Sequence, residues 1–161
     1  MIRQLAIALL LGGAAPAPAE NATPQFASTE ADRRAIGALL STYTTAVSTK
    51  NQALFEELLL GKDIPFSGIG RAVTPGTNDL RNYAEFRKGV FEGPPFVQRF
   101  QDVQIEQDGS LANVRLIFVN SGAGGRSWGW KTLQLVKVGS QWKIASEFYT
   151  GHSGDPPAAE R

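Results

Sequence analysis

The second half of the chain contains four segments that decide its fold: FVQRFQDVQIE at residues 96–106, LANVRLIFVN at 111–120, RSWGWKTLQLVKV at 126–138 and QWKIASEFY at 141–149. These segments are rich in β-branched and aromatic residues, which favour strands. Glycine-containing turns separate them at Asp108-Gly109, at residues 122–125 and at Gly139-Ser140. We therefore predict four consecutive antiparallel strands.

Helices are predicted before these strands. Apolar residues recur at helical spacing from Ile36 to Val47 and predict a helix of about 20 residues that begins near Thr29. Asn51 is suited to cap a second, short helix. Asn82 opens a third helix, and the prolines after Gly93 end it. Residues 64–69 and 71–74 are predicted as two short strands. Helices followed by strands indicate an α+β domain.

The last two strands form a hairpin whose register can be predicted. A two-residue turn at Gly139-Ser140 pairs Val138 with Gln141, and a constant register continues from there. One face of this hairpin then carries Leu133, Leu135, Trp142, Ile144 and Phe148. The other face carries Trp128, Trp130, Thr132, Glu147 and Tyr149. Because an exposed Trp–Trp–Tyr patch is costly in a monomer, we expect this second face to meet another copy of the chain in a homodimer.

The first 19 residues have the features of an export signal. Arg3 precedes an apolar run at residues 5–15, and Ala17-Pro18-Ala19 supplies small residues for cleavage near Ala19-Glu20. We expect a secreted or periplasmic protein, with residues 20–28 as a mobile lead, residues 29–153 as the domain and residues 154–161 as a disordered tail.

Charge and composition exclude several classes of partner and site. The chain has 16 Lys and Arg against 15 Asp and Glu, so no nucleic-acid or membrane partner is expected after signal removal. It has no cysteine and one histidine, so neither a disulfide nor a transition-metal site is expected. The glycine-rich residues 122–125 lack the Lys-Ser/Thr pair of a phosphate loop, and no cofactor is expected.

Three passages resemble a known superfamily: LLSTYTTAVSTKN at residues 39–51, NYAEF at 82–86, and QWKIA at 141–145 followed by His152-Ser153. They resemble the nuclear-transport-factor-2-like (NTF2-like) superfamily and its SnoaL-like polyketide-cyclase branch. The resemblance implies three N-terminal helices packed in the concave face of a strongly curved antiparallel sheet, a cone-like, cystatin-like roll with a pocket inside. This scaffold hosts isomerases, dehydratases, cyclases and proteins without catalytic activity.

The steroid-isomerase branch of that superfamily provides a test of activity. The resemblance places Tyr43 where those enzymes have an oxyanion-binding tyrosine. Their general base is a carboxylate on the strand before the third helix, but residues 64–69 read IPFSGI. Asp63 is the nearest carboxylate and comes several residues too early. The steroid-isomerase type of base is therefore absent.

Four residues are candidate ligand contacts: Tyr43, Tyr83, Trp130 and His152. Tyr43, His152 and Glu147 are candidate catalytic residues, although no complete catalytic constellation is visible. Each also has a structural alternative: Tyr43 as a core residue, His152 as the exposed end of a strand, and Glu147 at a dimer contact. We expect an exported protein that binds a small hydrophobic or cyclic molecule. The alternatives are an acid–base enzyme acting on a polyketide-like substrate and a homodimeric interaction module.

Overall fold

Helices come first and long strands follow in the computed structural model, which describes residues 26–69 and 80–157. The helical elements are α1 (Glu30–Ser48), α2 (Gln52–Glu56), α3 (Tyr83–Arg87) and a π-helical turn, η1 (Lys88–Glu92). The strands are β1 (Phe66–Gly68), β2 (Phe96–Asp108), β3 (Leu111–Gly122), β4 (Gly125–Val138), β5 (Gln141–Tyr149) and β6 (His152–Ser153). The predicted α+β class is confirmed.

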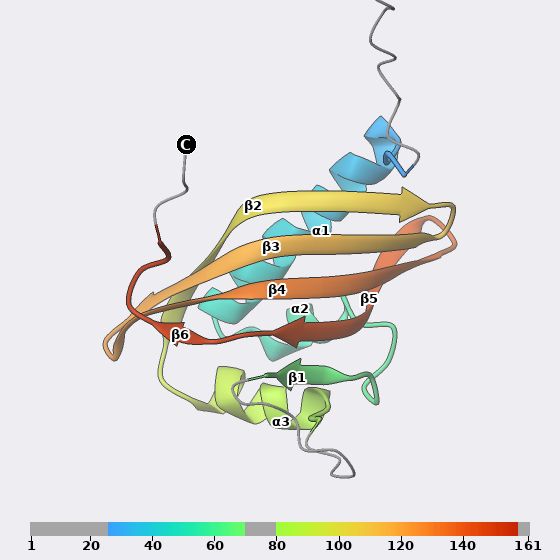
Figure 1. Cartoon of the computed structure of the whole chain (residues 1–161). Helices are drawn as coiled ribbons and strands as arrows, with labels where there is room; N and C mark the ends of the chain where they lie inside the picture. The colour runs from blue at the N-terminus through green and yellow to red at the C-terminus, as the bar shows by residue number, and fades with distance from the viewer. Residues whose placement is uncertain (1–25, 70–79, 158–161) are drawn as a thin grey trace, which may run out of the picture.

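The first helix begins where the sequence predicts. Thr29 caps α1, because its Oγ1 accepts a hydrogen bond from the Asp32 backbone N–H at 3.1 Å and donates one to Asp32 Oδ2 at 3.0 Å. The stripe from Ile36 to Val47 is buried against the sheet. Figure 1 shows α1 lying diagonally across one face of the sheet. This helix therefore closes the concave side that the NTF2-like resemblance implies.

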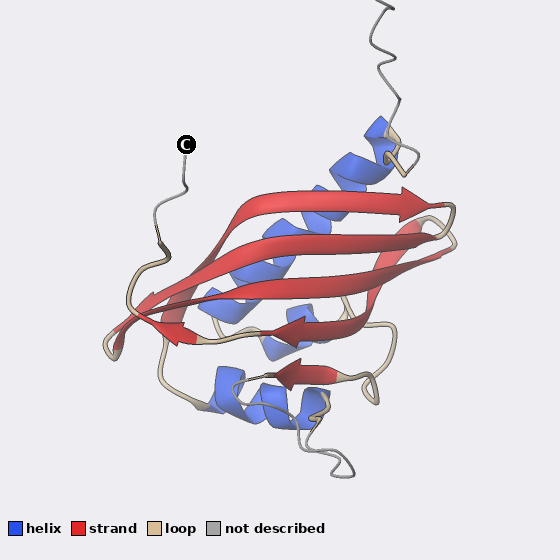
Figure 2. Cartoon of the chain, in the orientation of Figure 1, coloured by secondary structure: helices blue, strands red, loops and turns tan. Residues whose placement is uncertain are grey.

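The strands form one curved sheet in the order β1-β5-β4-β3-β2, and β6 pairs with β4 (Figures 1 and 2). The four long strands are antiparallel, as predicted. β1 adds a parallel pair beside β5, so the complete sheet is mixed. β1 lies within the predicted strand at residues 64–69, and the predicted strand at 71–74 falls outside the described residues. β2 is left as the edge strand next to α1.

Aromatic rings fill the core between α1, α2, α3 and the sheet. The buried Phe55 ring contacts Tyr43 with centroids 4.7 Å apart, Tyr83 at 5.9 Å and Phe86 at 5.6 Å. Phe66 of β1 packs on Phe86 at 4.6 Å. Such ring pairs stabilise a core beyond their buried area. In the described residues, the space between the helices and the centre of the sheet is therefore occupied by side chains.

A bulge in β5 corrects one sequence prediction. The register from Val138–Gln141 to Leu135–Ile144 is as predicted, but Gln134 then pairs with Ser146, so one extra residue has been inserted. Glu147 consequently lies opposite Leu133 and points into the core. The prediction that Glu147 and Tyr149 share a face with Trp130 is wrong, because the inserted residue reverses the side-chain alternation of the rest of the strand.

The predicted export signal and most of the predicted lead lie outside the described residues. Among the residues that the structure describes, no helix is long and apolar enough to cross a membrane.

Candidate functional site

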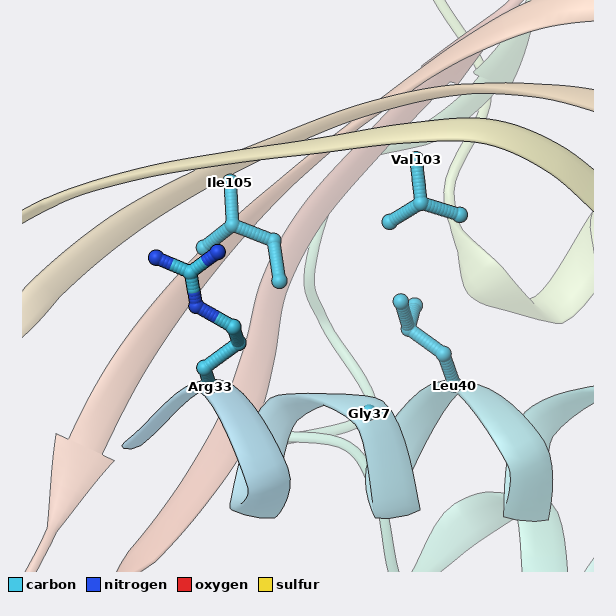
Figure 3. Close-up of a pocket in the computed structure, with 5 residues that line it drawn as sticks. All are labelled: Arg33, Gly37, Leu40, Val103 and Ile105. Carbon is cyan, nitrogen blue, oxygen red and sulfur yellow. The ribbon is translucent and has the colours of Figure 1, made fainter. Parts of the chain in front are cut away.

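A groove runs between helix α1 and edge strand β2 (Figure 3). It has a volume of about 390 Å³ and is lined by Arg33, Gly37 and Leu40 of α1 and by Val103 and Ile105 of β2. Gly37 leaves the helix surface bare, because a Cβ added there would meet no atom within 4 Å. In Figure 3 the Arg33 side chain rises toward β2 beside Ile105, and Leu40 and Val103 point toward one another. The groove thus has apolar walls and one guanidinium group at an end.

A bulge in β2 shapes this groove. The pairing of β2 with β3 shifts between Gln101 and Gln104, and Asp102 has a φ of 50°. That left-handed backbone conformation is uncommon outside glycine, and aspartate tolerates it better than most residues. The bulge presents Val103 to the groove with 41% of its surface exposed. The bulge therefore keeps an apolar side chain exposed at the edge of the core.

A second hollow of about 340 Å³ continues along α1 from Leu40, which lines both cavities. Its walls include Thr44 of α1 and Gln98 and Arg99 of β2. Gln98 is 8% exposed; its Nε2 donates to Asn120 Oδ1 at 2.8 Å, and its Oε1 has no hydrogen-bond partner among the described residues. The two hollows together follow α1 for several turns.

A buried polar triad lies deeper, beneath the centre of the sheet. Lys131 Nζ lies 2.7 Å from Glu147 Oε1 and donates to the Tyr43 hydroxyl at 2.6 Å. The Tyr43 hydroxyl donates to Glu147, with distances of 2.8 and 3.0 Å to the two carboxylate oxygens. The Lys131 and Glu147 side chains are 2% and 0% exposed. Each polar atom of the triad is therefore satisfied within the protein.

Burial displaces the ionisation of all three groups. It raises the pKa of the Glu147 carboxyl above 4.5 and lowers the pKa of the Lys131 amine below 10.5. Each charge partly opposes this effect by stabilising the other. The pKa of the Tyr43 phenol rises well above 10.0 because of burial first and the Glu147 charge second. The triad is thus a coupled acid–base set sealed from solvent.

Four aromatic rings surround the Lys131 ammonium. Its Nζ lies 4.5 Å from the centre of the Tyr43 ring, 5.2 Å from Phe118, and 5.5 Å from both Phe100 and Tyr149. Each distance is within the range of a cation–π interaction. This aromatic cage compensates part of the desolvation of the buried charge.

The structure brings together only part of the set of residues that the sequence singled out. Tyr43 and Glu147 are in direct contact in the triad. Tyr83 is buried nearby, and its hydroxyl donates to Glu56 Oε1 at 3.2 Å. Trp130 is 45% exposed on the opposite face of the sheet, where His152 stacks on Trp128 with ring centroids 4.5 Å apart. The four candidate ligand contacts do not line one common cavity among the described residues.

Sequence reasoning missed Lys131 and the α1–β2 groove. A signal for Lys131 exists, because it shares the strand alternation of Leu133 and Leu135, which lie in the core. Gly37 in the middle of a predicted helix was the available signal for the groove, since glycine disfavours a helix interior. The bulge that presents Val103 had no comparable signal.

A metal centre finds no support in the part of the chain that the structure describes. No cluster there of three or more histidine, cysteine, aspartate or glutamate side chains could hold a metal ion.

Comparisons with known proteins identify the fold. No protein-family model and no curated protein matches the sequence. Among solved structures, the chain is similar to an NTF2-like protein of unknown function from Pseudomonas putida, with 14% identity, a TM-score of 0.63, and coverage of 83% of this chain and 95% of that one. It is also similar to a Novosphingobium aromaticivorans protein named as a candidate scytalone dehydratase, with 16% identity, a TM-score of 0.59, and coverage of 81% and 95%.

A third similar structure is a cystatin-like protein of unknown function from Nostoc punctiforme, with 12% identity, a TM-score of 0.61, and coverage of 81% of this chain and 96% of that one. The likeness extends over nearly the whole of each neighbour, and at these identities it shows the fold alone. The chain has the NTF2-like fold.

Proposed function

We propose that this protein binds a small hydrophobic molecule in the groove between α1 and β2. The observation that supports this proposal is a hollow of about 390 Å³ with apolar walls and a single charged group at its rim. Small-molecule sites typically fall in the range of about 300–1,000 Å³ and combine apolar walls with few polar groups. The proposal keeps the ligand between helix and sheet, as the sequence suggested. It moves the contacts from the buried Tyr43 and Tyr83 to the edge of the core.

The exposure of Val103 favours a bound ligand over an empty surface. A backbone in the left-handed conformation at Asp102 is less favourable than an ordinary strand. It nevertheless holds an apolar side chain 41% exposed beside Leu40. A hydrophobic ligand would cover this side chain, and removing its apolar surface from water would stabilise the complex.

Substitutions at Gly37 test the proposal. Gly37→Leu places a large side chain in the groove, whereas Gly37→Ala adds one methyl group into open space. Alanine should stabilise the helix by about 1 kcal/mol, so it serves as the folded control. A fluorescent hydrophobic dye should bind the wild-type protein and Gly37→Ala, and should bind Gly37→Leu at least about tenfold more weakly. Equal binding by all three proteins would contradict the groove as the site.

An acid–base enzyme is the second candidate, and the triad is the observation that favours it. Perturbed, coupled ionisable groups cluster at active sites, and Tyr43, Lys131 and Glu147 form such a cluster. One similar structure also bears a dehydratase name. The expected activity is proton exchange on an enolisable cyclic ketone, measured as deuterium incorporation by mass spectrometry. Because the triad is sealed from solvent, this activity requires the core to open to the ketone. Glu147→Gln should abolish it, and an absence of exchange by the wild-type protein would remove this candidate.

Two further proposals concern the state of the protein in the cell. Export is supported by the signal-like residues 1–19, and N-terminal sequencing of protein from the exported fraction should begin near Glu20.

Homodimer formation, or contact with a partner protein, is supported by Trp130, which is 45% exposed and lies opposite Ile117 on the outer face of the sheet. Sedimentation should show a dimer that Trp130→Ser dissociates, and a monomeric wild-type protein would rule out the homodimer.

A further inference from the structure

We propose that the ligand of the α1–β2 groove is an elongated amphipathic carboxylate whose anionic head pairs with Arg33. This inference rests on the proposed function and specifies the chemical class of the ligand. Among the described residues that line the hollow of about 390 Å³, Arg33 is the only charged one. The remaining lining residues offer a bare helix backbone at Gly37 and aliphatic side chains at Leu40, Val103 and Ile105. A site with one cation at its end and apolar walls matches a molecule with one anion at its end and an apolar body.

Arg33 is available to a ligand. No ion pair or side-chain hydrogen bond of the described residues uses the Arg33 guanidinium, whereas its neighbour Arg34 pairs with Glu30 at 3.0 Å. The adjacent Asp32 carboxylate already accepts hydrogen bonds from Lys137 Nζ at 2.7 Å and from the Trp142 indole at 3.0 Å. A guanidinium group can bind a carboxylate through two parallel hydrogen bonds, which favours a carboxylate over an uncharged polar head such as a hydroxyl.

The length of the groove points to an elongated tail. Arg33 and Leu40 are seven residues apart on α1, a rise of about 10 Å, and the second hollow extends to Thr44, about 16 Å from Arg33 along the helix axis. Leu40 lines both hollows, so a tail that fills the first can continue into the second beside Phe100. Affinity should therefore rise with chain length, by at most about fourfold for each fully buried methylene, until the tail passes Thr44.

Acidic side chains on β2 do not occupy the site. Asp102, Glu106 and Asp108 are exposed and line neither hollow. Arg99 adds a second positive charge to the wall of the second hollow. The local charge therefore favours an anion over a cation of the same length.

Three probes of equal chain length test the inference on the purified protein: dodecanoate, dodecanol and dodecyltrimethylammonium, each below its micelle-forming concentration. Calorimetry or dye displacement should show dodecanoate binding about tenfold more tightly than dodecanol, as expected for a hydrogen-bonded ion pair. Added salt should weaken the binding of dodecanoate and leave the binding of dodecanol unchanged. The ammonium probe should bind most weakly.

Two matched variants identify the residue. Arg33→Met should remove the preference of the protein for the acid over the alcohol. Arg34→Met makes the same chemical change one position along the helix, outside the groove lining, and should keep the preference. Arg33→Lys should retain part of it, because the charge remains without the planar pair of donors.

The outcomes distinguish this inference from the proposed function. Equal binding of acid and alcohol, or a preference unchanged in Arg33→Met, would overturn the inference while leaving a hydrophobic groove in place. Failure of every probe and of the dye to bind would overturn both.

Discussion

Replacing Lys131 by methionine removes one partner of the buried ion pair and keeps a side chain of similar length. Glu147 is 0% exposed, and its remaining hydrogen-bond donor is the Tyr43 hydroxyl. Removing one member of a buried pair leaves an uncompensated charge and typically lowers the free energy of unfolding by about 3–5 kcal/mol. A domain of this size has about 5–15 kcal/mol in total, so Lys131→Met should still fold but with much lower stability.

The loss of stability in Lys131→Met should depend on pH, and the pKa of Glu147 decides in which direction. Its folded pKa lies above 4.5 because of burial and rises further when Lys131 is absent. At a pH above 4.5, Glu147 of the folded Lys131→Met variant keeps a proton that Glu147 of the unfolded variant has released. Its free energy of unfolding therefore falls by about 1.4 kcal/mol per pH unit as the pH rises, until Glu147 ionises in the folded state. Wild-type Glu147 also has a raised folded pKa, but Lys131 limits the rise, so the wild-type protein shows this fall over a shorter pH range. The gap between variant and wild type should therefore be smallest in acid and widen toward neutrality.

Urea denaturation followed by tryptophan fluorescence measures these differences. Lys131→Met combined with Glu147→Gln removes both charges and should recover at least half of the loss. Tyr43→Phe should lose about 1.5–3 kcal/mol, the typical value of hydrogen bonds to charged groups. Lys88→Met, at an exposed position, should change stability by less than about 0.5 kcal/mol. A single Lys131→Met variant within about 1 kcal/mol of wild type, or a double variant as unstable as the single one, would refute the reasoning.

Three other measurements follow from individual contacts. The hydrogen bond from Lys137 is the main reason why the folded pKa of Asp32 lies well below 3.8. The ionised Asp32 therefore stabilises the folded protein above pH 3.8, and this contribution is lost as the pH falls. Asp32→Asn should be less stable than wild type at neutral pH, and the difference in free energy of unfolding should close in acid. Gly129→Ala would drive a Cβ into the Thr150 carbonyl oxygen and should cost about 1–3 kcal/mol in denaturation, whereas Gly124→Ala enters open space and should change little. Burial raises the pKa of Tyr149 to about 12, so one tyrosine of the folded protein should ionise near that pH by absorbance, and Tyr149→Phe should remove that step.

Local signals in the sequence were sufficient to predict most secondary-structure elements and the α+β class. Thr29 and Asn82 form side-chain caps at the starts of their helices, as their positions predicted. The turn at Gly139-Ser140 set the first pairs of the last hairpin as expected. Helix caps and two-residue turns depend on residues only a few positions apart, so the sequence contains the information that determines them.

The site depended on information that is not local. One bulge turned Glu147 inward, and another presented Val103 to the groove. Both faces of the hairpin carry apolar residues, so hydrophobic alternation alone does not say which residue is inserted or where. Tyr43 is hydrogen-bonded to Lys131, 88 positions away along the chain, and to Glu147, 104 positions away. The amino-acid sequence therefore determined which segments become helices and strands, whereas packing of the sheet against α1 decided which side chains meet, because a one-residue shift in a strand exchanges its buried and exposed faces.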